Sequence, residues 1–233
     1  ALSWHVGGRD VLWTASHPAY EPGKAVRGGV PVVFPWFGAY TLGERSGELP
    51  PHGFARERDW LVTTLGDGPI ARFELRADDA SRAVFPHEFR AELEFALDGD
   101  STEVGLRITM RVHNEGADEF VFEQALHTYF AVGDIHGAEV HGLEGVACVE
   151  HAALPEASWD RDAPLQFRAE TDRVFQSTPP RIELLAPSLQ RRVRLDAEHA
   201  DSAIVWNPWI EKTKRLSQMA RDDWQTFCCI ETA

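Results

Sequence analysis

Two runs of strict alternation decide the fold, FRAELEFAL at residues 89–97 and VGLRITMRV at residues 104–112. In each run an apolar side chain occupies every second position, and charged or polar side chains fill most positions between them. Successive side chains of a strand point to opposite faces of its sheet, so a period of two predicts antiparallel strands with one buried face and one wet face.

Shorter apolar stretches on both sides of this pair predict further strands. Glycine (18) and proline (14) are frequent and break the chain into short segments. Only residues 214–223 have the pattern of a helix. The expected strands are residues 2–5, 10–14, 60–65, 70–75, 138–141, 146–149, 173–175, 181–185, 191–196, 203–206 and 226–230.

These segments predict an all-β fold, a large antiparallel β-sandwich that forms a single domain over residues 1–233. The sequence has no internal repeat and no linker-like tract. It starts at Ala1 inside an expected strand and stops at Ala233 just after another. We therefore expect the native chain to continue beyond these ends.

The net charge restricts the possible binding partners, and the cysteine content indicates the redox environment. The formal net charge of −14 disfavours nucleic acid and anionic membranes as partners, and an anionic substrate would need a local cluster of arginines. Cys148, Cys228 and Cys229 are odd in number and two are adjacent, which favours a reducing cytoplasmic environment. No apolar run approaches the roughly 20 residues of a membrane helix. We expect a cytoplasmic monomer.

A histidine lies near the centre of the chain, in LHTYF at residues 126–130. Apolar Phe120 and Phe122 precede it, so we expect His127 where a buried strand ends. A histidine with one packed side and one free side is suited to proton transfer near neutral pH. On its own, His127 also fits a packed core histidine.

Two irregular apolar segments carry basic side chains. RGGVPVVFPWFG at residues 27–38 is too rich in glycine and proline for a regular strand, and PHGFAR at residues 51–56 is similar. Such segments line a pocket or form buried connections. Arg27, His52 and Arg56 would face a ligand in the first case, whereas Arg56 would pair with a nearby acid in the second.

Other catalytic motifs are absent from the sequence. His136, Glu139 and His141 have metal-ligating side chains, but strand positions five apart face opposite sides of a sheet. The sequence has no G-x-S-x-G nucleophile motif and no phosphate-binding glycine motif. The remaining acids, histidines and arginines at strand ends predict general acid–base chemistry on a small polar molecule, without a metal or another cofactor.

Six motifs then occur in the order and approximate spacing of a known family, RGGVPVVFPWFG, PHGFAR, LHTYF, TDRVF, VWNPW and ETA. From Leu2 to its end the chain resembles the hexose-6-phosphate mutarotases, the glucose-6-phosphate 1-epimerase branch of the aldose 1-epimerase family. The resemblance implies a galactose-mutarotase-like β-sandwich. It also implies an isomerase that interconverts the α and β anomers of an aldohexose phosphate.

The resemblance further implies roles for single residues. His127 would be the general acid that protonates the ring oxygen, and Glu231 the base that deprotonates the anomeric hydroxyl. By the same resemblance, Arg27 and Arg56 would bind the phosphate, and guanidinium suits bidentate phosphate contacts.

The same resemblance implies which residues contact the sugar. Asp172 would accept hydrogen bonds from sugar hydroxyls, and His52 would donate one. Pro51 stands where some relatives have a glutamine that contacts substrate, and its side chain offers no hydrogen bond.

Two other functions remain open at this point. In one, the substrate is a free aldose such as galactose or glucose and the arginines are structural. In the other, the chain is a catalytically silent sugar-binding domain, although a binder has no need of a matched acid and base.

Overall fold

The described part of the chain in this computed structural model forms two compact units. The first unit contains Ala1–Tyr20, Ala25–Val32 and Ala125–Ala233, and the second contains Glu21–Lys24 and Val33–Gln124. Whether both belong to one domain, as the sequence predicts, stays a prediction. The residues that the structure describes are 1–41, 47–66, 68–99, 103–153 and 159–233.

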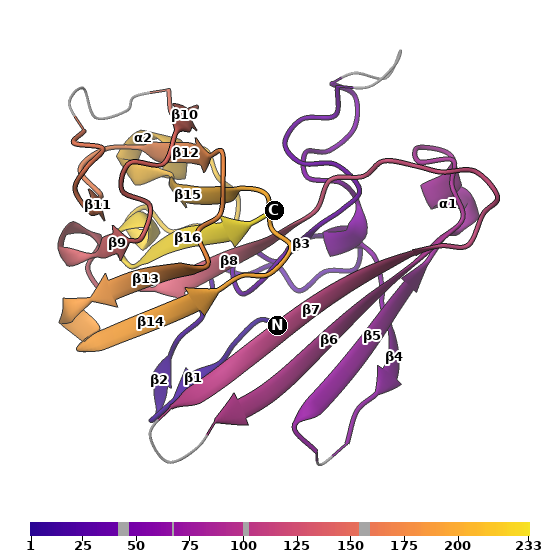
Figure 1. The fold of residues 1–233 in the computed structure, drawn as a ribbon, viewed down its shortest axis with the longest axis horizontal. Helices are drawn as coiled ribbons and strands as arrows, with labels where there is room; N and C mark the ends of the chain where they lie inside the picture. Colours follow the sequence, from indigo (N-terminus) through magenta and orange to yellow (C-terminus); the bar gives the residue numbers. More distant parts are fainter. Residues whose placement is uncertain (42–46, 67, 100–102, 154–158) are drawn as a thin grey trace. The chain divides into compact units, whose positions relative to one another are not determined.

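The second unit is built on an antiparallel sheet with the strand order β4-β5-β6-β7 (Figure 1). The two alternating runs pair with each other along their length. Ala91 and Leu93 are buried and Glu92 between them is half-buried, as the alternation predicts. At the other end of the pair Leu97 and Val104 are exposed, so the predicted buried face is only partly covered. The strands are β4 (Leu61–Thr64), β5 (Ile70–Arg76), β6 (Phe89–Gly99) and β7 (Val104–Asn114).

Short helices accompany this sheet. The 3-10 helix η2 (Ala55–Glu57) follows the PHG sequence, and α1 (Asp79–Arg82) follows β5. Helix α1 was not among the predicted elements. Asp78 caps it, because its carboxylate accepts from the Ser81 backbone N–H at 2.6 Å while the Ser81 hydroxyl receives the Asp78 N–H at 2.9 Å.

The first unit contains a larger sheet with the order β10-β12-β15-β16-β8-β3 and a smaller one with the order β11-β9-β13-β14. The larger sheet consists of β10 (Cys148–Glu150), β12 (Thr171–Phe175), β15 (Ala203–Asn207), β16 (Phe227–Thr232), β8 (Ala125–Ala131) and β3 (Val32–Val33), where the chain passes between units. The smaller sheet consists of β11 (Leu165–Gln166), β9 (Glu139–His141), β13 (Arg181–Ala186) and β14 (Arg191–Asp196).

These two sheets share one core, which makes the first unit a β-sandwich. Phe130, Ile230 and Val205 from the larger sheet and Val140 and Leu184 from the smaller one belong to a single buried cluster. In an antiparallel sheet this leaves the opposite face of β8, β16 and β15 free to carry other side chains. The short helices of this unit are η3 (Ile135–Gly137), η4 (Pro187–Leu189), α2 (Trp209–Thr213) and η5 (Asp223–Gln225).

The expected hairpin near the start of the chain is present but shorter than predicted. β1 (His5–Val6) pairs with β2 (Arg9–Asp10), and Gly7 and Gly8 between them both have positive φ, 58° and 75°. Two successive positive φ angles are typical of the tight turns that join such strands, and glycine adopts them without strain.

Two expectations about secondary structure were wrong. His127 does not lie where a strand ends, because β8 begins only at Ala125 and continues to Ala131. Residues 214–223 do not form a helix. The left-handed backbone of Gln218 (φ 69°) interrupts the segment, and the Gln218 side chain accepts hydrogen bonds from the backbone N–H groups of Ala19 and Arg27. These tertiary contacts outweigh the local helical preference. No helix in the described part of the chain is long and apolar enough to span a membrane.

Candidate functional site

His127 and Glu231 lie opposite each other on neighbouring strands. The register of β8 and β16 pairs them directly, and directly paired side chains share a face of the sheet. Nε2 of His127 is 3.3 Å from Oε1 of Glu231. The Glu231 side chain is 2% exposed and that of His127 is 10% exposed. An imidazole and a carboxylate, which can exchange protons with a ligand, therefore lie side by side where little solvent reaches them.

Aromatic rings hold the imidazole of His127 in place. Tyr129 stacks on it, with ring centroids 4.9 Å apart and an interplanar angle of 11°. Trp206 of β15 meets it edge to face at 5.9 Å. Burial, with the nearby Cys229 and Glu231, raises the pKa of Tyr129 well above its usual value, while Arg27 opposes the shift. The phenol therefore stays neutral, and the ring stack limits the orientations open to the imidazole.

Arg27 approaches this group through Tyr129. One of its terminal nitrogens donates to the Tyr129 hydroxyl at 3.5 Å, and its Nε donates to the backbone carbonyl of Ser217 at 3.1 Å. The Gln218 amide oxygen accepts from the Arg27 backbone N–H at 3.1 Å. The loop that was expected to be helical thus fixes both the backbone and the guanidinium of Arg27. Its guanidinium contacts the tyrosine that stacks on His127.

Asp172 lies on the same sheet face as His127 and Glu231. It pairs with Trp206, which in turn pairs with Cys229 two residues before Glu231. Alternate residues of paired strands share a face, which places the Asp172 side chain on this side as well. β12 and β8 are three strand spacings apart, which is about 14 Å. Trp206, on the strand between β12 and β16, forms the apolar surface between Asp172 and the acid–base pair.

A lysine and a second acid accompany Asp172, and the sequence had not indicated either. Lys212 of α2 places its Nζ 3.1 Å from Oδ2 of Asp172 and 3.1 Å from Oε1 of Glu170. The Glu170 side chain is 4% exposed. Glu170 could have been found from the sequence, because it is an acid only two residues before Asp172. Lys212 had none, because it is 40 residues from Asp172 in sequence.

His52 and Arg56 belong to the second unit. His52 has a left-handed backbone (φ 66°), and its Nδ1 accepts the backbone N–H of Gly38 at 3.3 Å. Arg56 donates to the carbonyl of Pro51 at 2.7 Å. The structure thus brings His127, Glu231, Arg27 and Asp172 together on the first unit, whereas a shared site with His52 and Arg56 stays a prediction.

Sulfur chemistry is disfavoured on this sheet. Cys228 and Cys229 are fully buried and carry no disulfide, and burial raises the pKa of both thiols. A protonated, inaccessible thiol is a poor nucleophile and a poor metal ligand. His127 and Glu231 on this face have the residue types that general acid–base chemistry requires.

Metal-ligating side chains do not gather elsewhere in the described ranges. No group of three or more His, Cys, Asp or Glu side chains there has the geometry to hold a metal ion. Glu139 and His141, two of the three residues with metal-ligating side chains in that segment, contact each other at 3.1 Å. The side-chain amide of Gln166 also donates to Glu139 at 2.7 Å. The Glu139 carboxylate is therefore already hydrogen-bonded within its sheet.

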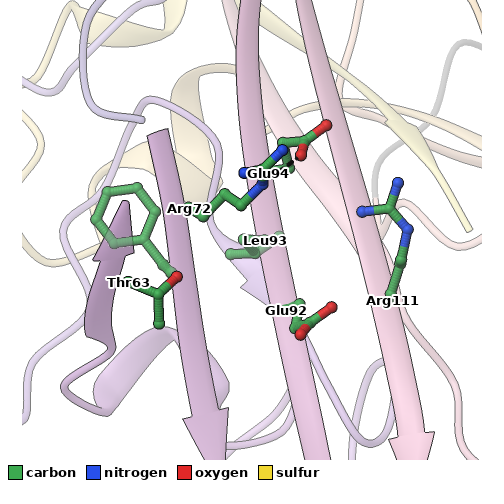
Figure 2. Close-up of a pocket in the computed structure, with 7 residues that line it drawn as sticks. Thr63, Arg72, Glu92, Leu93, Glu94 and Arg111 are labelled. Atoms are coloured by element: carbon green, nitrogen blue, oxygen red, sulfur yellow. Dashed lines mark hydrogen bonds and ion pairs between the residues drawn. The ribbon is translucent and has the colours of Figure 1, made fainter. Parts of the chain in front are cut away.

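A surface hollow on the second unit contains none of the predicted site residues. It lies over the β4–β7 sheet, and Figure 2 shows Arg72 and Glu94 on adjacent strands with Arg111 on the next strand along. Arg72 is paired with Glu94 at 2.6 Å, and Glu92 contacts His113 at 3.1 Å. Exposed pairs of this kind contribute little to stability and already satisfy each other's charge. We assign no chemical role to this hollow.

Comparison with known proteins matches the whole length of the chain. The family model described as aldose 1-epimerase matches residues 2–233. A protein of Escherichia coli named "putative glucose-6-phosphate 1-epimerase" is 33% identical over 236 residues, which cover 100% of this chain and 76% of that protein.

Solved structures agree with that match. The crystal structure of a "putative mutarotase" from Salmonella typhimurium has a TM-score of 0.84 and 31% identity, covering 99% of this chain and 75% of the other. A galactose mutarotase-like protein from Lactobacillus casei has a TM-score of 0.70 at 18% identity, covering 97% and 77% of the two chains. The expected galactose-mutarotase-like β-fold is thereby confirmed.

Proposed function

Because this chain belongs to the aldose 1-epimerase family, we propose that it is a mutarotase that interconverts the α and β anomers of an aldohexose 6-phosphate, with glucose 6-phosphate as its main substrate. The observation that carries the proposal is the direct pairing of His127 with Glu231 on one sheet face, 3.3 Å apart. The name of the Escherichia coli relative supports the choice of a phosphorylated sugar.

The reaction requires two proton transfers. Glu231 removes the proton from the hydroxyl on C1 while His127 gives a proton to the ring oxygen, and the C1–O5 bond breaks as the C1 carbonyl forms. Rotation about C1–C2 exposes the other carbonyl face, and ring closure returns both protons to their original donors. The two reacting oxygens are both bonded to C1. A donor and an acceptor on paired strands can therefore reach them together.

The neighbouring groups would bind and orient the sugar. Trp206 offers a flat apolar surface to the pyranose ring, and Asp172 accepts hydroxyl protons beside it. Arg27 and Arg56 would take the phosphate, because a chain of net charge −14 repels an anionic substrate unless local guanidinium groups attract it. His52 would donate to a further hydroxyl.

Two further properties belong to this proposal. The cysteines in the described residues are all free, Cys148 being partly buried and Cys228 and Cys229 fully buried, which favours a reducing cytoplasm. We also propose that the enzyme works as a monomer, without a nucleic acid or membrane partner.

The test is NMR exchange spectroscopy on the anomeric protons of glucose 6-phosphate, with free glucose and galactose measured in parallel. The proposal predicts exchange above the spontaneous rate that is strongest for the phosphate. Faster exchange of the free sugars alone would assign the chain to free aldoses, and no enhancement of any sugar would leave a silent sugar-binding domain.

A further inference from the structure

Lys212 lies between two carboxylates at the edge of the proposed sugar site. Its Nζ is 3.1 Å from Oδ2 of Asp172, 3.1 Å from Oε1 of Glu170 and 5.8 Å from the centre of the Trp206 ring. The Lys212 side chain is 28% exposed, whereas that of Glu170 is 4% exposed. Such a buried carboxylate is costly without a compensating charge, and Lys212 supplies that charge.

The backbone around Asp172 is fixed from the other side. The Asp172 N–H donates to Oε1 of Glu150 at 3.0 Å, and the Asp172 carbonyl accepts from the N–H of His151 at 2.7 Å. Glu150 is itself held by Nε of the buried Arg173 at 2.7 Å. The main chain of Asp172 is therefore held from the β10 side, and its carboxylate is oriented by Lys212.

The position of Lys212 follows from the break after β15. The Asn207 side chain accepts the backbone N–H of Trp209 at 2.9 Å, which starts α2 directly after the strand. Lys212 lies within this single helical turn, and the Thr213 hydroxyl bonds back to the carbonyl of Trp209. A short, doubly tethered helix thus presents the ammonium group to the face that carries Trp206 and Asp172.

From this geometry we propose that Lys212 is a positioning residue that holds the Asp172 carboxylate in the orientation required for sugar binding. The Lys212 ammonium group donates to Oδ2 of Asp172, so that Oδ1 would accept a hydrogen bond from a sugar hydroxyl. Its positive charge, 3.1 Å from a carboxylate oxygen of both Glu170 and Asp172, also offsets the repulsion between these two side chains. The inference rests on the proposed mutarotase function and adds a residue to its site.

The role predicts a specific kinetic signature. Asp172 would bind the sugar equally in the ground state and the transition state, so loss of its orientation should raise KM and leave kcat nearly unchanged. Lys212→Met removes the ammonium group and keeps an unbranched side chain one atom shorter. We expect KM for glucose 6-phosphate to rise about tenfold, the usual scale for one hydrogen bond to a charged group. Lys212→Arg should restore most of the affinity.

A matched control is available in the same helical segment. Lys214, which directly follows α2, pairs with Glu211 instead of Asp172 and Glu170, so Lys214→Met should leave KM unchanged. Thermal unfolding of each variant, measured beside its kinetics, identifies any change that comes from folding alone.

The deciding experiment measures KM for Lys212→Met in two backgrounds, wild type and Asp172→Asn. A positioning role predicts a rise of about tenfold in the wild-type background and almost none once Asp172 is already replaced. An equal rise in both backgrounds, an unchanged KM in the wild-type background, or a fall in kcat at constant KM would overturn the inference. If wild-type protein itself does not accelerate mutarotation, the proposed function fails instead, and the two failures are distinguishable.

Discussion

Nε2 of His127 and Oε1 of Glu231 are 3.3 Å apart because β8 and β16 bring these residues into direct register. Each strand places its residue on the face opposite the sandwich core of the first unit. The positions of both groups therefore depend on strand pairing rather than on a loop, and paired strands hold reacting groups more rigidly than loops do.

The two groups should act as one unit. Glu231→Gln or His127→Gln alone interrupts the same pair of coupled proton transfers, so the double variant should be scarcely slower than either single variant. Anomeric exchange rates of the three variants test this. Losses that multiply in the double variant would show that the two residues contribute independently.

Arg56 should discriminate between phosphorylated and free sugars. Arg56→Ala removes a guanidinium that would bind only the phosphate, so KM for glucose 6-phosphate should rise by about tenfold or more while values for free glucose stay nearly constant. Arg192→Ala, on an exposed side chain of β14, serves as the control. Equal effects of Arg56→Ala on both sugars would remove its phosphate role.

Asn207 should be important for stability. Its amide donates to the carbonyls of Trp224 and Phe227 at 2.9 and 2.8 Å, and the residue is fully buried. Asn207→Ala leaves these buried carbonyls without their donor and should lower the free energy of unfolding by about 3 kcal/mol.

Urea unfolding of Asn207→Ala beside Asn114→Ala measures the effect. Asn114 is exposed, so its substitution should cost less than about 1 kcal/mol. A similar small loss at Asn207 would contradict the role assigned to its amide.

The cap of α1 should make a pH-dependent contribution. The Ser81 backbone N–H, helped by the charge of Arg58, holds the pKa of Asp78 below its usual 3.8. A lowered pKa means that the carboxylate stabilises the fold above pH 3.8 and that this contribution disappears as the pH falls through the folded-state value.

Asp78→Ala should therefore cost about 1 kcal/mol at neutral pH, with a smaller difference from wild type under acid conditions. Asp78→Asn, which keeps an acceptor without the titrating group, is the matched control and should recover only part of the loss at neutral pH. If the cost of Asp78→Ala remained constant as the pH was lowered through this range, the ionised cap would not be its source.

The alternating runs at residues 89–97 and 104–112 were sufficient to predict their own pairing, because alternation is a local property of the sequence. The apolar pattern before His127 predicted the wrong place for this residue in its strand. Apolar Phe120 and Phe122 continue the pattern without belonging to β8. Alternation alone does not indicate where the ladder hydrogen bonds begin.

Contacts between residues far apart in the chain could not be predicted from local sequence patterns. The pairing of His127 with Glu231 joins residues 104 positions apart, and no local pattern specifies that register. The same applies to Lys212, whose partner lies on β12, and to Gln218, whose bonds to Ala19 and Arg27 replace the expected helix. These features depend on which elements meet in three dimensions.

Glu231→Gln tests most directly whether Glu231 is the base of a mutarotase. The amide keeps the size of the side chain but does not accept the anomeric proton, so anomeric exchange of glucose 6-phosphate in NMR should slow by at least about a hundredfold. Binding of the sugar phosphate, titrated in the same samples, should change little. Near-normal exchange by Glu231→Gln would contradict the account.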